Sequence, residues 1–589
     1  MRQVGMVLGS REAKALDFWV GVEEGQYLRL DDLVYVEFRH PDPRKGDENG
    51  NVRYYGMVVD VIKLYEGKPF DTDVFLAQRN LLPVSLSYVA YVQITRIMPE
   101  EYLPPDPGAP VYLAQGDLLE LALYYDRMQE QKLPVGLLKN GEVAYVNFEF
   151  LNGFKGGHVN ISGVSGVAAK TSYATFLLHS IFQSSANRQK ANTKALIFNV
   201  KGEDLFYLDK DNSGLNDEAK AAYQKLGLPA QAFRSVAFLA PPRKTPGDIL
   251  ADVGRHDASA YHWDLVQFCR EGLLPFLFTD RGAMSNLGFL IDQVTERLRR
   301  LVGDEKGGQK GPALQVDDWT DELSAMEADV AFNELGKLKV TTFTALVRYI
   351  EFKLLGPETT EEDENKRLKG DPRWTARQAT GTLEAFVRRL RAAIGNVEHL
   401  IRGDKAGNRP NPLSSQAQVS VVDIHQLSAQ GQMFVVGSIL REVFGRKERG
   451  DYAGRVFVVL DELNKYAPRD GESPIKDILL DIAERGRSLG VILIGAQQTA
   501  SEVESRIVGN AAIRVVGRLD AAEAERPEYR YLPPSFRQRA VILPQGTMIL
   551  HQPEVPVPLA LTFPLPAWAM KKDEVSEDVS AEKLSRLID

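Results

Sequence analysis

The chain has 589 residues, of which 44% are hydrophobic and 26% are charged, so we expect about two to four soluble globular domains. Its single cysteine, Cys269, excludes an intrachain disulfide and a thiolate-built metal cluster. The formal net charge of -9 excludes a surface that is basic everywhere, but a nucleic-acid channel needs only a local basic lining. No apolar run approaches the roughly 20 residues that span a bilayer, and no signal-peptide core is present, so we expect a cytoplasmic protein without a membrane contact.

The first segment, residues 1–103, alternates apolar and polar side chains in runs such as "DDLVYVEFRH" and "VSLSYVAYVQITRIM". Such alternation predicts half-buried strands, and therefore a small all-β barrel or sandwich. Residues 103–111, "LPPDPGAPV", contain four prolines. This composition predicts a stiff connector between the first segment and the rest of the chain.

Residues 158–182, "HVNISGVSGVAAKTSYATFLLHSIF", predict a short strand, a glycine-containing loop and an apolar helix. A phosphate-binding loop needs converging backbone N–H groups, a lysine for the phosphate charge and a hydroxyl for Mg²⁺ at a helix start. Lys170 and Thr171 supply the last two in the required order, although the usual G-x-x-x-x-G-K-[ST] spelling has glycines where Val164 and Ala169 stand. The alternative is a strand–turn–helix unit with an exposed lysine. The candidate nucleotide-binding residues are Gly163, Gly166, Ala169, Lys170, Thr171 and Ser172.

Short apolar runs, including "KALIFNV", "VAFLA", "VSVVDI", "RVFVVLDE" and "VILIGAQQ", follow the connector and alternate with helical patterns. Strands of this kind are buried on both faces, which predicts an α/β fold with a parallel sheet covered by helices. Between residues 241 and 418 the strands stop and amphipathic patterns such as "NLGFLIDQVTERLRRLVG" predict a helical insertion. The expected divisions are the barrel at 1–103, two parts of an α/β core at 104–240 and 419–566, the insertion at 241–418 and a polar tail at 567–589.

Two acidic residues, Asp461 and Glu462, end the apolar run in residues 455–468, "RVFVVLDELNKYAP". Because such a run is buried as a central strand, its acids emerge at the carboxyl edge of the sheet, beside the expected phosphate loop. There Asp461 would hold Mg²⁺, commonly through water, and Glu462 would orient or deprotonate an attacking water. The alternative is a pair of acids that only cap the next helix.

A further apolar strand, "GVILIGAQQ", presents Gln497 and Gln498 at its end, where a side-chain amide could sense a γ-phosphate or hold a water. The segment before it, "DIAERGRSLG", places Arg485 and Arg487 at a helix end. Either arginine could act as an arginine finger or cap backbone carbonyls. Lys201 in "NVKGED" is either a pore residue or a strand-end lysine.

The order of these motifs carries a family resemblance. The barrel, "GVSGVAAKTS", "KGED", the insertion, "SVVDIHQLSAQGQMFVVGSILREVF", "VVLDELNKYAP", "AERGRSLGVILIGAQQ" and "NAAIRVVGRLD" together resemble the HerA family. This family consists of hexameric, FtsK-like motor ATPases with an amino-terminal HerA–ATP-synthase-type barrel. The resemblance covers most of the chain, and its phosphate loop departs from the family's usual G-x-T-G-S-G-K-S. It implies a RecA/FtsK-like P-loop ATPase core with a parallel-type central sheet.

The resemblance also implies roles and partners. Lys170 and Thr171 would bind ATP and Mg²⁺, and Asp461 and Glu462 would match the Walker B pair. Partners would be double-stranded DNA, five further copies of the chain in a homohexamer, and a NurA-type nuclease docked on the barrel, which together process DNA ends for recombinational repair. Gln498 aligns with the glutamine of the family's "ATQ" segment. Arg487 aligns with the arginine of its "EGR" segment, which would place it near a nucleotide across or within a subunit interface. Arg514 and Arg518 are reserve candidates for the same role.

Two functional classes remain open, and a third, a conjugation or packaging ATPase, is more remote because no membrane segment supports it. The first is a DNA-translocating ATPase, a helicase-like motor whose hydrolysis moves pore loops along a duplex. The second is an assembly ATPase whose ring scaffolds an effector, such as a nuclease or an NAD-consuming enzyme in antiphage defence.

Overall fold

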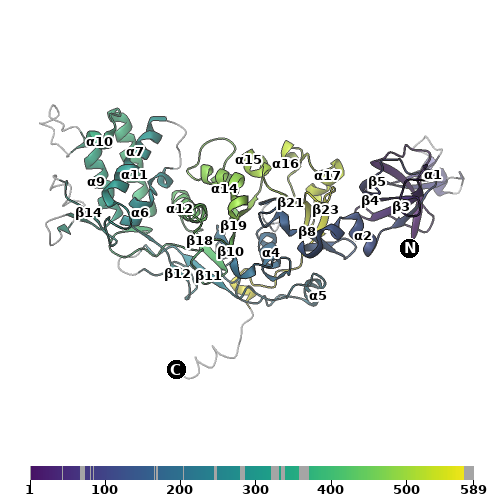
Figure 1. The fold of residues 1–589 in the computed structure, drawn as a ribbon, viewed down its shortest axis with the longest axis horizontal. Helices are drawn as coiled ribbons and strands as arrows, with labels where there is room; N and C mark the ends of the chain where they lie inside the picture. Colours follow the sequence, from purple (N-terminus) through teal and green to yellow (C-terminus); the bar gives the residue numbers. More distant parts are fainter. Residues whose placement is uncertain are drawn as a thin grey trace, which may run out of the picture.

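The computed structural model describes residues 2–42, 44–66, 73–79, 81–83, 85–164, 166, 170–202, 204–244, 249–278, 285–319, 331–332, 338–356 and 370–575. The described chain is elongated (Figure 1): a barrel forms one end, a large sheet with its helices forms the middle, and a group of helices forms the other end. None of the described helices combines the length and apolarity needed to cross a membrane.

The amino-terminal segment folds into the predicted barrel. Its strands close in the order β1-β2-β5-β4-β3-β6, and alternate side chains such as Val34, Val36 and Phe38 fill its core. The closing strand, β6 (Pro110–Leu113), pairs with β1 and β3 and lies beyond residue 103, inside and after the segment expected to be a connector. A proline is tolerated there because it is the first residue of the strand. The other strands are β1 (Gln3–Val7), β2 (Asp17–Val22), β3 (Leu33–Arg39), β4 (Asn51–Tyr65) and β5 (Leu86–Met98), with helix α1 at Asp73–Gln78.

The middle of the molecule is a 12-stranded sheet in the order β12-β11-β18-β10-β19-β20-β9-β21-β22-β23-β7-β8. The run from β12 to β21 is parallel and the remaining pairs are antiparallel, so the predicted α/β class with a parallel central sheet is confirmed. The parallel strands are β9 (Val159–Ser162), β10 (Thr193–Asn199), β11 (Val236–Ala240), β12 (Ser259–Ala260), β18 (Val419–Asp423), β19 (Arg455–Asp461), β20 (Val491–Gln497) and β21 (Ile513–Val516); the others are β7 (Lys132–Leu138), β8 (Val143–Asn147), β22 (Thr547–His551) and β23 (Leu559–Thr562).

Helices cover both faces of this sheet. In β19, Phe457 and Val459 pack into the cluster that contains α4 (Lys170–Gln183), whereas Val458 and Leu460 pack into the cluster that contains α12 (Ala429–Glu448) and α14 (Lys476–Leu489). Since side chains of a strand alternate between faces, Asp461 lies on the α4 side. The remaining helices of this part are α2 (Asp117–Ala122), α3 (Tyr125–Met128), α5 (Asp217–Lys225), α13 (Leu463–Tyr466), α15 (Ser505–Gly509), α16 (Ala521–Ala524) and α17 (Pro534–Ile542).

The far end is mainly helical, as the amphipathic patterns predicted. In α7 (Ser285–Val302), Leu287, Leu290, Ile291 and Val294 are buried at helical spacing. The expectation that strands stop between residues 241 and 418 is wrong in detail, because this region contains several short strands. Strands of two or three residues are too short to show an alternation of apolar and polar residues. They are β13 (Trp263–Asp264), β14 (Leu314–Val316), β15 (Ala331–Phe332), β16 (Leu338–Val340) and β17 (Ile401–Arg402), and β12 of the same range joins the central sheet beside β11. The helices are α6 (Leu265–Glu271), α9 (Phe343–Leu355), α10 (Pro372–Thr375) and α11 (Thr380–Val397).

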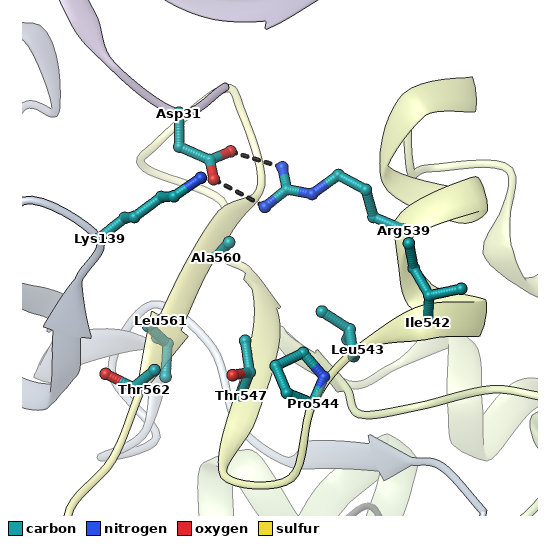
Figure 2. Close-up of a pocket in the computed structure, with 10 residues that line it drawn as sticks. All are labelled: Asp31, Lys139, Arg539, Ile542, Leu543, Pro544, Thr547, Ala560, Leu561 and Thr562. Carbon is teal, nitrogen blue, oxygen red and sulfur yellow. Dashed lines mark hydrogen bonds and ion pairs between the residues drawn. The ribbon is translucent and has the colours of Figure 1, made fainter. Parts of the chain in front are cut away.

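An ion pair fastens the barrel to the sheet domain (Figure 2). The guanidinium of Arg539 on α17 donates to both carboxylate oxygens of Asp31, in the turn before β3, at 2.7 Å each. A largely apolar cavity of about 290 Å³ lies beside this pair, between α17 and the β22–β23 hairpin, and Lys139 reaches its rim from the β7–β8 turn. The bidentate pair restricts the relative orientation of the guanidinium and the carboxylate.

Candidate nucleotide-binding site

The described part of the phosphate loop is anchored at the carboxyl edge of the parallel strands. The backbone N–H of Gly163 donates to the carbonyl of Gln497 at 3.2 Å, and that of Val164 donates to the carbonyl of Arg518 at 2.7 Å. Gly166 has φ 83°, a backbone conformation that favours glycine. Ala169 lies outside the described residues. The loop therefore leaves β9 held between β20 and the segment after β21.

Lys170 is the first residue of α4, and it is not the exposed lysine of the alternative interpretation. It exposes only 4% of its surface, and its ammonium donates to the carbonyl of Gly163 at 2.6 Å. The pKa of Lys170 is lowered to about 8, chiefly by burial and in part by the positive charge of Lys201, while Asp461 and Glu462 act in the opposite direction. A buried cation at the start of a helix favours an anionic ligand, because negative charge would replace the hydration that the ammonium has lost.

Asp461 joins the two halves of the predicted site. The hydroxyl of Thr171 donates to Asp461 Oδ2 at 3.1 Å, although the two residues are 290 positions apart in the sequence. The backbone N–H of Glu462 donates to the other oxygen, Oδ1, at 2.9 Å. Ser172 follows in the first turn of α4 and is half-buried. The hydroxyl and the carboxylate thus meet at one point beside the lysine, which is the pair of ligands predicted for Mg²⁺.

Glu462 occupies an unusual backbone conformation. Its φ of 56° is in the left-handed region, where a residue other than glycine is strained by on the order of 1 kcal/mol or more. It precedes α13 as the N-cap residue, yet its side chain makes no capping hydrogen bond. The helix-capping alternative therefore lacks its defining interaction at Glu462. The carboxylate is half-buried at the end of β19, next to the Mg²⁺ ligand predicted at Asp461.

The two glutamines after β20 occupy different environments. Gln497 is fully buried, and its amide nitrogen donates to Asn160 Oδ1 at 2.8 Å and to Ser162 Oγ at 2.9 Å. Because β20 alternates, Gln497 lies on the face opposite the α4 side, away from Asp461. Gln498 is the first residue beyond the strand and is exposed at the carboxyl edge. Of the two, Gln498 is the one whose side chain is accessible to a ligand at that edge.

The predicted arginine lies far from this edge. Arg487 is in the last turn of α14, just before β20 begins, and its guanidinium donates to the carbonyl of Phe154 at 2.6 Å. It is therefore at the amino edge of the strands, and the fold does not bring it together with Lys170 or Asp461. Arg485 pairs with Glu448 at 2.5 Å. Of the reserve candidates, Arg514 lies on β21 over the ring of Tyr531, whereas Arg518 follows β21 at the same edge as the phosphate loop.

Sequence reasoning named Lys201 but missed its contact with Asp461, and it missed the polar groups on the neighbouring strands. Lys201, just after β10, places its ammonium 2.7 Å from Asp461 Oδ2. On the next strand, Asp423 accepts from the amide of Asn199 at 3.1 Å and lies 2.8 Å from His425 Nδ1, and burial raises the pKa of Asp423. The signal was available, because Asn199 and Asp423 each end an apolar run, as Asp461 does. What was missing was the strand order that makes β18, β10 and β19 neighbours.

Comparisons with known proteins give a likeness of fold and no family. No family model matches the chain, and no curated protein does. Solved structures that are similar include VirB4 of Thermoanaerobacter pseudethanolicus, with 14% identity over 73% of this chain and 96% of that one at a TM-score of 0.42. The bacterial conjugative coupling protein TrwBdeltaN70 shares 11% identity over 77% of this chain and 93% of its own, at a TM-score of 0.44. A genome packaging NTPase, B204 from Sulfolobus turreted icosahedral virus 2, covers 25% of this chain and 69% of its own at 14% identity and a TM-score of 0.21. Likeness at this level does not decide function, so the functional argument rests on the site.

Proposed function

We propose that the chain is a P-loop ATPase that binds ATP and Mg²⁺ at the carboxyl edge of its parallel sheet. The observation that carries the proposal is the hydrogen bond from Thr171 to Asp461 beside the buried ammonium of Lys170. A helix start, a lysine, a hydroxyl and a strand-end carboxylate at one place are the parts that hold a nucleotide phosphate and its metal ion. In the part of the chain that the structure describes, no group of three or more His, Cys, Asp and Glu side chains is placed to hold a metal ion by itself.

Each residue has a separate task in this proposal. Lys170 and the first turn of α4 bind the phosphates, and Thr171 and Asp461 would hold Mg²⁺, the aspartate through water. When bound, Mg²⁺ supplies neutralisation of the charge that builds up on the phosphates. Glu462, held beside the site by its left-handed backbone, orients the attacking water and accepts its proton. Gln498 is accessible from the same edge and would contact the water or the terminal phosphate.

We further propose that the active form is a ring, a homohexamer by the family resemblance. The support is the position of Arg487 at the amino edge of the strands. If this arginine acts on a nucleotide, that nucleotide must belong to a neighbouring subunit, because the site of its own chain is at the opposite edge. An arginine supplied across an interface makes hydrolysis depend on assembly.

The work done by hydrolysis is proposed to be translocation along double-stranded DNA, with a nuclease of the NurA type docked on the barrel for DNA-end processing. Both the duplex and the nuclease follow from the HerA resemblance of the motifs. The second candidate, an assembly ATPase that scaffolds an effector, is favoured by the ion pair between Asp31 and Arg539, which joins the barrel to the sheet domain. A barrel joined in this way can present one docking surface per subunit of a ring.

Turnover of ATP with and without duplex DNA, at two salt concentrations, tests the motor. We expect DNA to raise the rate of the full chain, and binding to lose orders of magnitude between roughly 50 and 200 mM salt if about six or more phosphates are contacted. The net charge of -9 makes the test sharp, since the chain has no general attraction for DNA. The Lys170→Ala protein is the control for contaminating ATPase. A rate that is indifferent to DNA but raised by the barrel-bound partner would reject the motor and support the assembly ATPase.

A further inference from the structure

The ammonium of Lys201 and the hydroxyl of Thr171 contact the same oxygen of Asp461. The Lys201 ammonium lies 2.7 Å from Asp461 Oδ2, and the Thr171 hydroxyl donates to the same oxygen at 3.1 Å. The Asp461 side chain is 6% exposed, whereas that of Lys201 is 39% exposed. The carboxylate is therefore fixed in the protein, while the ammonium approaches it from the solvent side on a flexible stem.

The turn after β10 holds Lys201 in this position. The side-chain amide of Asn199 donates to the carbonyl of Gly202 at 2.7 Å, which closes the turn around Lys201. β10 and β19 are neighbouring parallel strands with Phe198 opposite Leu460, so residues just beyond their ends lie side by side. The contact between Lys201 and Asp461 is thus built by the strand pairing and by the closed turn.

Mg²⁺ held by Thr171 and Asp461 and the ammonium of Lys201 compete for the same carboxylate. Two unit charges about 4 Å apart interact by about 4 kcal/mol at an effective dielectric constant of about 20, and a divalent ion doubles that repulsion. One cation must therefore leave when the other arrives. The phosphates that come with the metal ion bring several negative charges to the same place, which gives the displaced ammonium a new partner within reach of its stem.

We propose that Lys201 is a positioning residue that serves as the counter-ion of Asp461 until the Mg²⁺-nucleotide displaces it, and that it then pairs with the phosphates. This inference rests on the proposed function of the site. It assigns Lys201 neither to a pore nor to a merely structural strand end. Its presence also explains part of the low pKa of Lys170, since two ammonium groups beside one carboxylate repel each other.

The test is a Mg²⁺ titration of the binding of fluorescent ADP to the full-length protein, with Lys201→Met, Lys201→Gln and Lys201→Arg. Without the competing charge, we expect the half-saturating Mg²⁺ concentration to fall about tenfold in the Met and Gln variants. Without Mg²⁺, their affinity for ADP should fall by a similar factor, because Asp461 has lost its counter-ion and repels the phosphates. The Arg variant, which keeps the charge, should stay close to the unmodified protein, and so should Lys210→Met, which removes an exposed lysine elsewhere.

A second readout uses no nucleotide. Mg²⁺ alone should raise the unfolding temperature of the Lys201→Met protein at concentrations that leave the unmodified protein unchanged, since ligand binding to the native state stabilises it. An unchanged Mg²⁺ dependence in both uncharged variants would overturn the role of Lys201 alone. Failure of the unmodified protein to bind Mg²⁺-ADP, or binding that survives Lys170→Ala, would instead overturn the proposed function.

Discussion

The two edges of the parallel strands hold similar residues in different ways. At the carboxyl edge, charged side chains contact one another: the ammonium of Lys201 and the hydroxyl of Thr171 meet at one oxygen of Asp461. At the amino edge, several polar side chains contact the backbone instead, although Arg485 pairs with the side chain of Glu448. There Arg487 donates to the carbonyl of Phe154, Arg455 to that of Asn152 at 2.7 Å, and Lys447 to that of Tyr452 at 2.9 Å, while His158 Nδ1 accepts from the N–H of Leu493 at 3.0 Å.

The two edges therefore contribute differently to stability and to ligand binding. A bond from a side chain to a backbone carbonyl pairs both groups, so the amino edge is largely satisfied within the chain, although Nε2 of His158 is buried without a hydrogen-bond partner among the described residues. At the carboxyl edge one carboxylate oxygen serves two donors, a lysine is buried at a helix start, and Glu462 has a strained backbone. Substitutions at the carboxyl edge should therefore change ligand binding and chemistry, and substitutions at the amino edge should change stability, unless a residue there serves a neighbouring subunit.

The largest expected effect is at the carboxyl edge. Glu462→Gln should lower ATP hydrolysis by about 10²- to 10⁴-fold with little change in nucleotide affinity, because only the group that accepts the proton is lost. Lys170→Ala should weaken nucleotide binding itself. Phosphate release and fluorescent-nucleotide binding measure the two effects separately.

The matched control for this pair is Glu472→Gln, which makes the same change on an exposed residue away from the site. It should leave both readouts unchanged. Turnover of the Glu462→Gln protein close to that of the unmodified chain would remove Glu462 from the catalytic assignment.

Arg487 lies at the amino edge and is exposed, yet the HerA resemblance links it to catalysis. Arg487→Ala should lower the unfolding free energy by about 1 kcal/mol or less, because its hydrogen bond is solvent-exposed. ATP hydrolysis should nevertheless fall by at least about tenfold if the arginine completes a neighbour's site. Mixing Arg487→Ala subunits with Lys170→Ala subunits should restore part of the rate, as some interfaces then combine an intact arginine with an intact lysine.

Arg485→Ala is the control, two residues earlier on the same helix and paired with Glu448. It should lower the unfolding free energy no more than Arg487→Ala does, and it should leave the rate of ATP hydrolysis unchanged. If the mixture recovers no activity, or if a monomer is fully active, Arg487 has no role in a neighbouring site and is a structural residue of the amino edge.

The fold was predictable where local patterns carry it. The alternation in the first segment gave the barrel, and the uniform apolar runs gave the parallel sheet. The closing strand of the barrel, β6, was missed because its prolines are typical of a connector and because its partners β1 and β3 are distant in sequence. The antiparallel extension through β22, β23, β7 and β8 also depends on pairing between distant segments, since β7 precedes β23 by most of the chain.

The residues of the candidate site were also predictable only where a local motif carries them. Lys170, Thr171 and Asp461 were found because each stands in a recognisable local motif, and the structure brings the three together. The ion pair of Lys201 with Asp461 and the contact of Asn199 with Asp423 require the order of β18, β10 and β19, which no local pattern encodes. The face of a strand also decided between Gln497 and Gln498, and that depends on where the strand ends, a boundary that sequence patterns do not fix.

His158 tests the amino edge through the pH dependence of stability. Burial lowers the pKa of His158 to about 4, and its Nδ1 accepts a hydrogen bond from the backbone of Leu493, which requires the neutral ring. The folded pKa is below the unfolded value of about 6.5, so the unfolded state binds more protons between these two values. The contribution of His158 is thus fully present above about pH 6.5 and is lost as the pH falls toward 4. From pH 7 to pH 5 the unfolding free energy should fall by about 2 kcal/mol on account of this residue.

Denaturant unfolding at pH 7 and pH 5 of the unmodified protein and of His158→Asn measures this contribution. Asparagine tolerates the left-handed backbone of position 158, where φ is 67°, and has no titratable ring. The variant should be less stable at pH 7, because the buried N–H of Leu493 loses its partner, but it should lose less stability on acidification. His179 and His399 also have pKa values lowered by burial to about 4, so a shallower slope should remain. Exposed His256→Asn should keep the full slope. Equal slopes for the His158 variant and the unmodified protein would show that this histidine is not held neutral, and that the amino edge is less complete than its hydrogen bonds indicate.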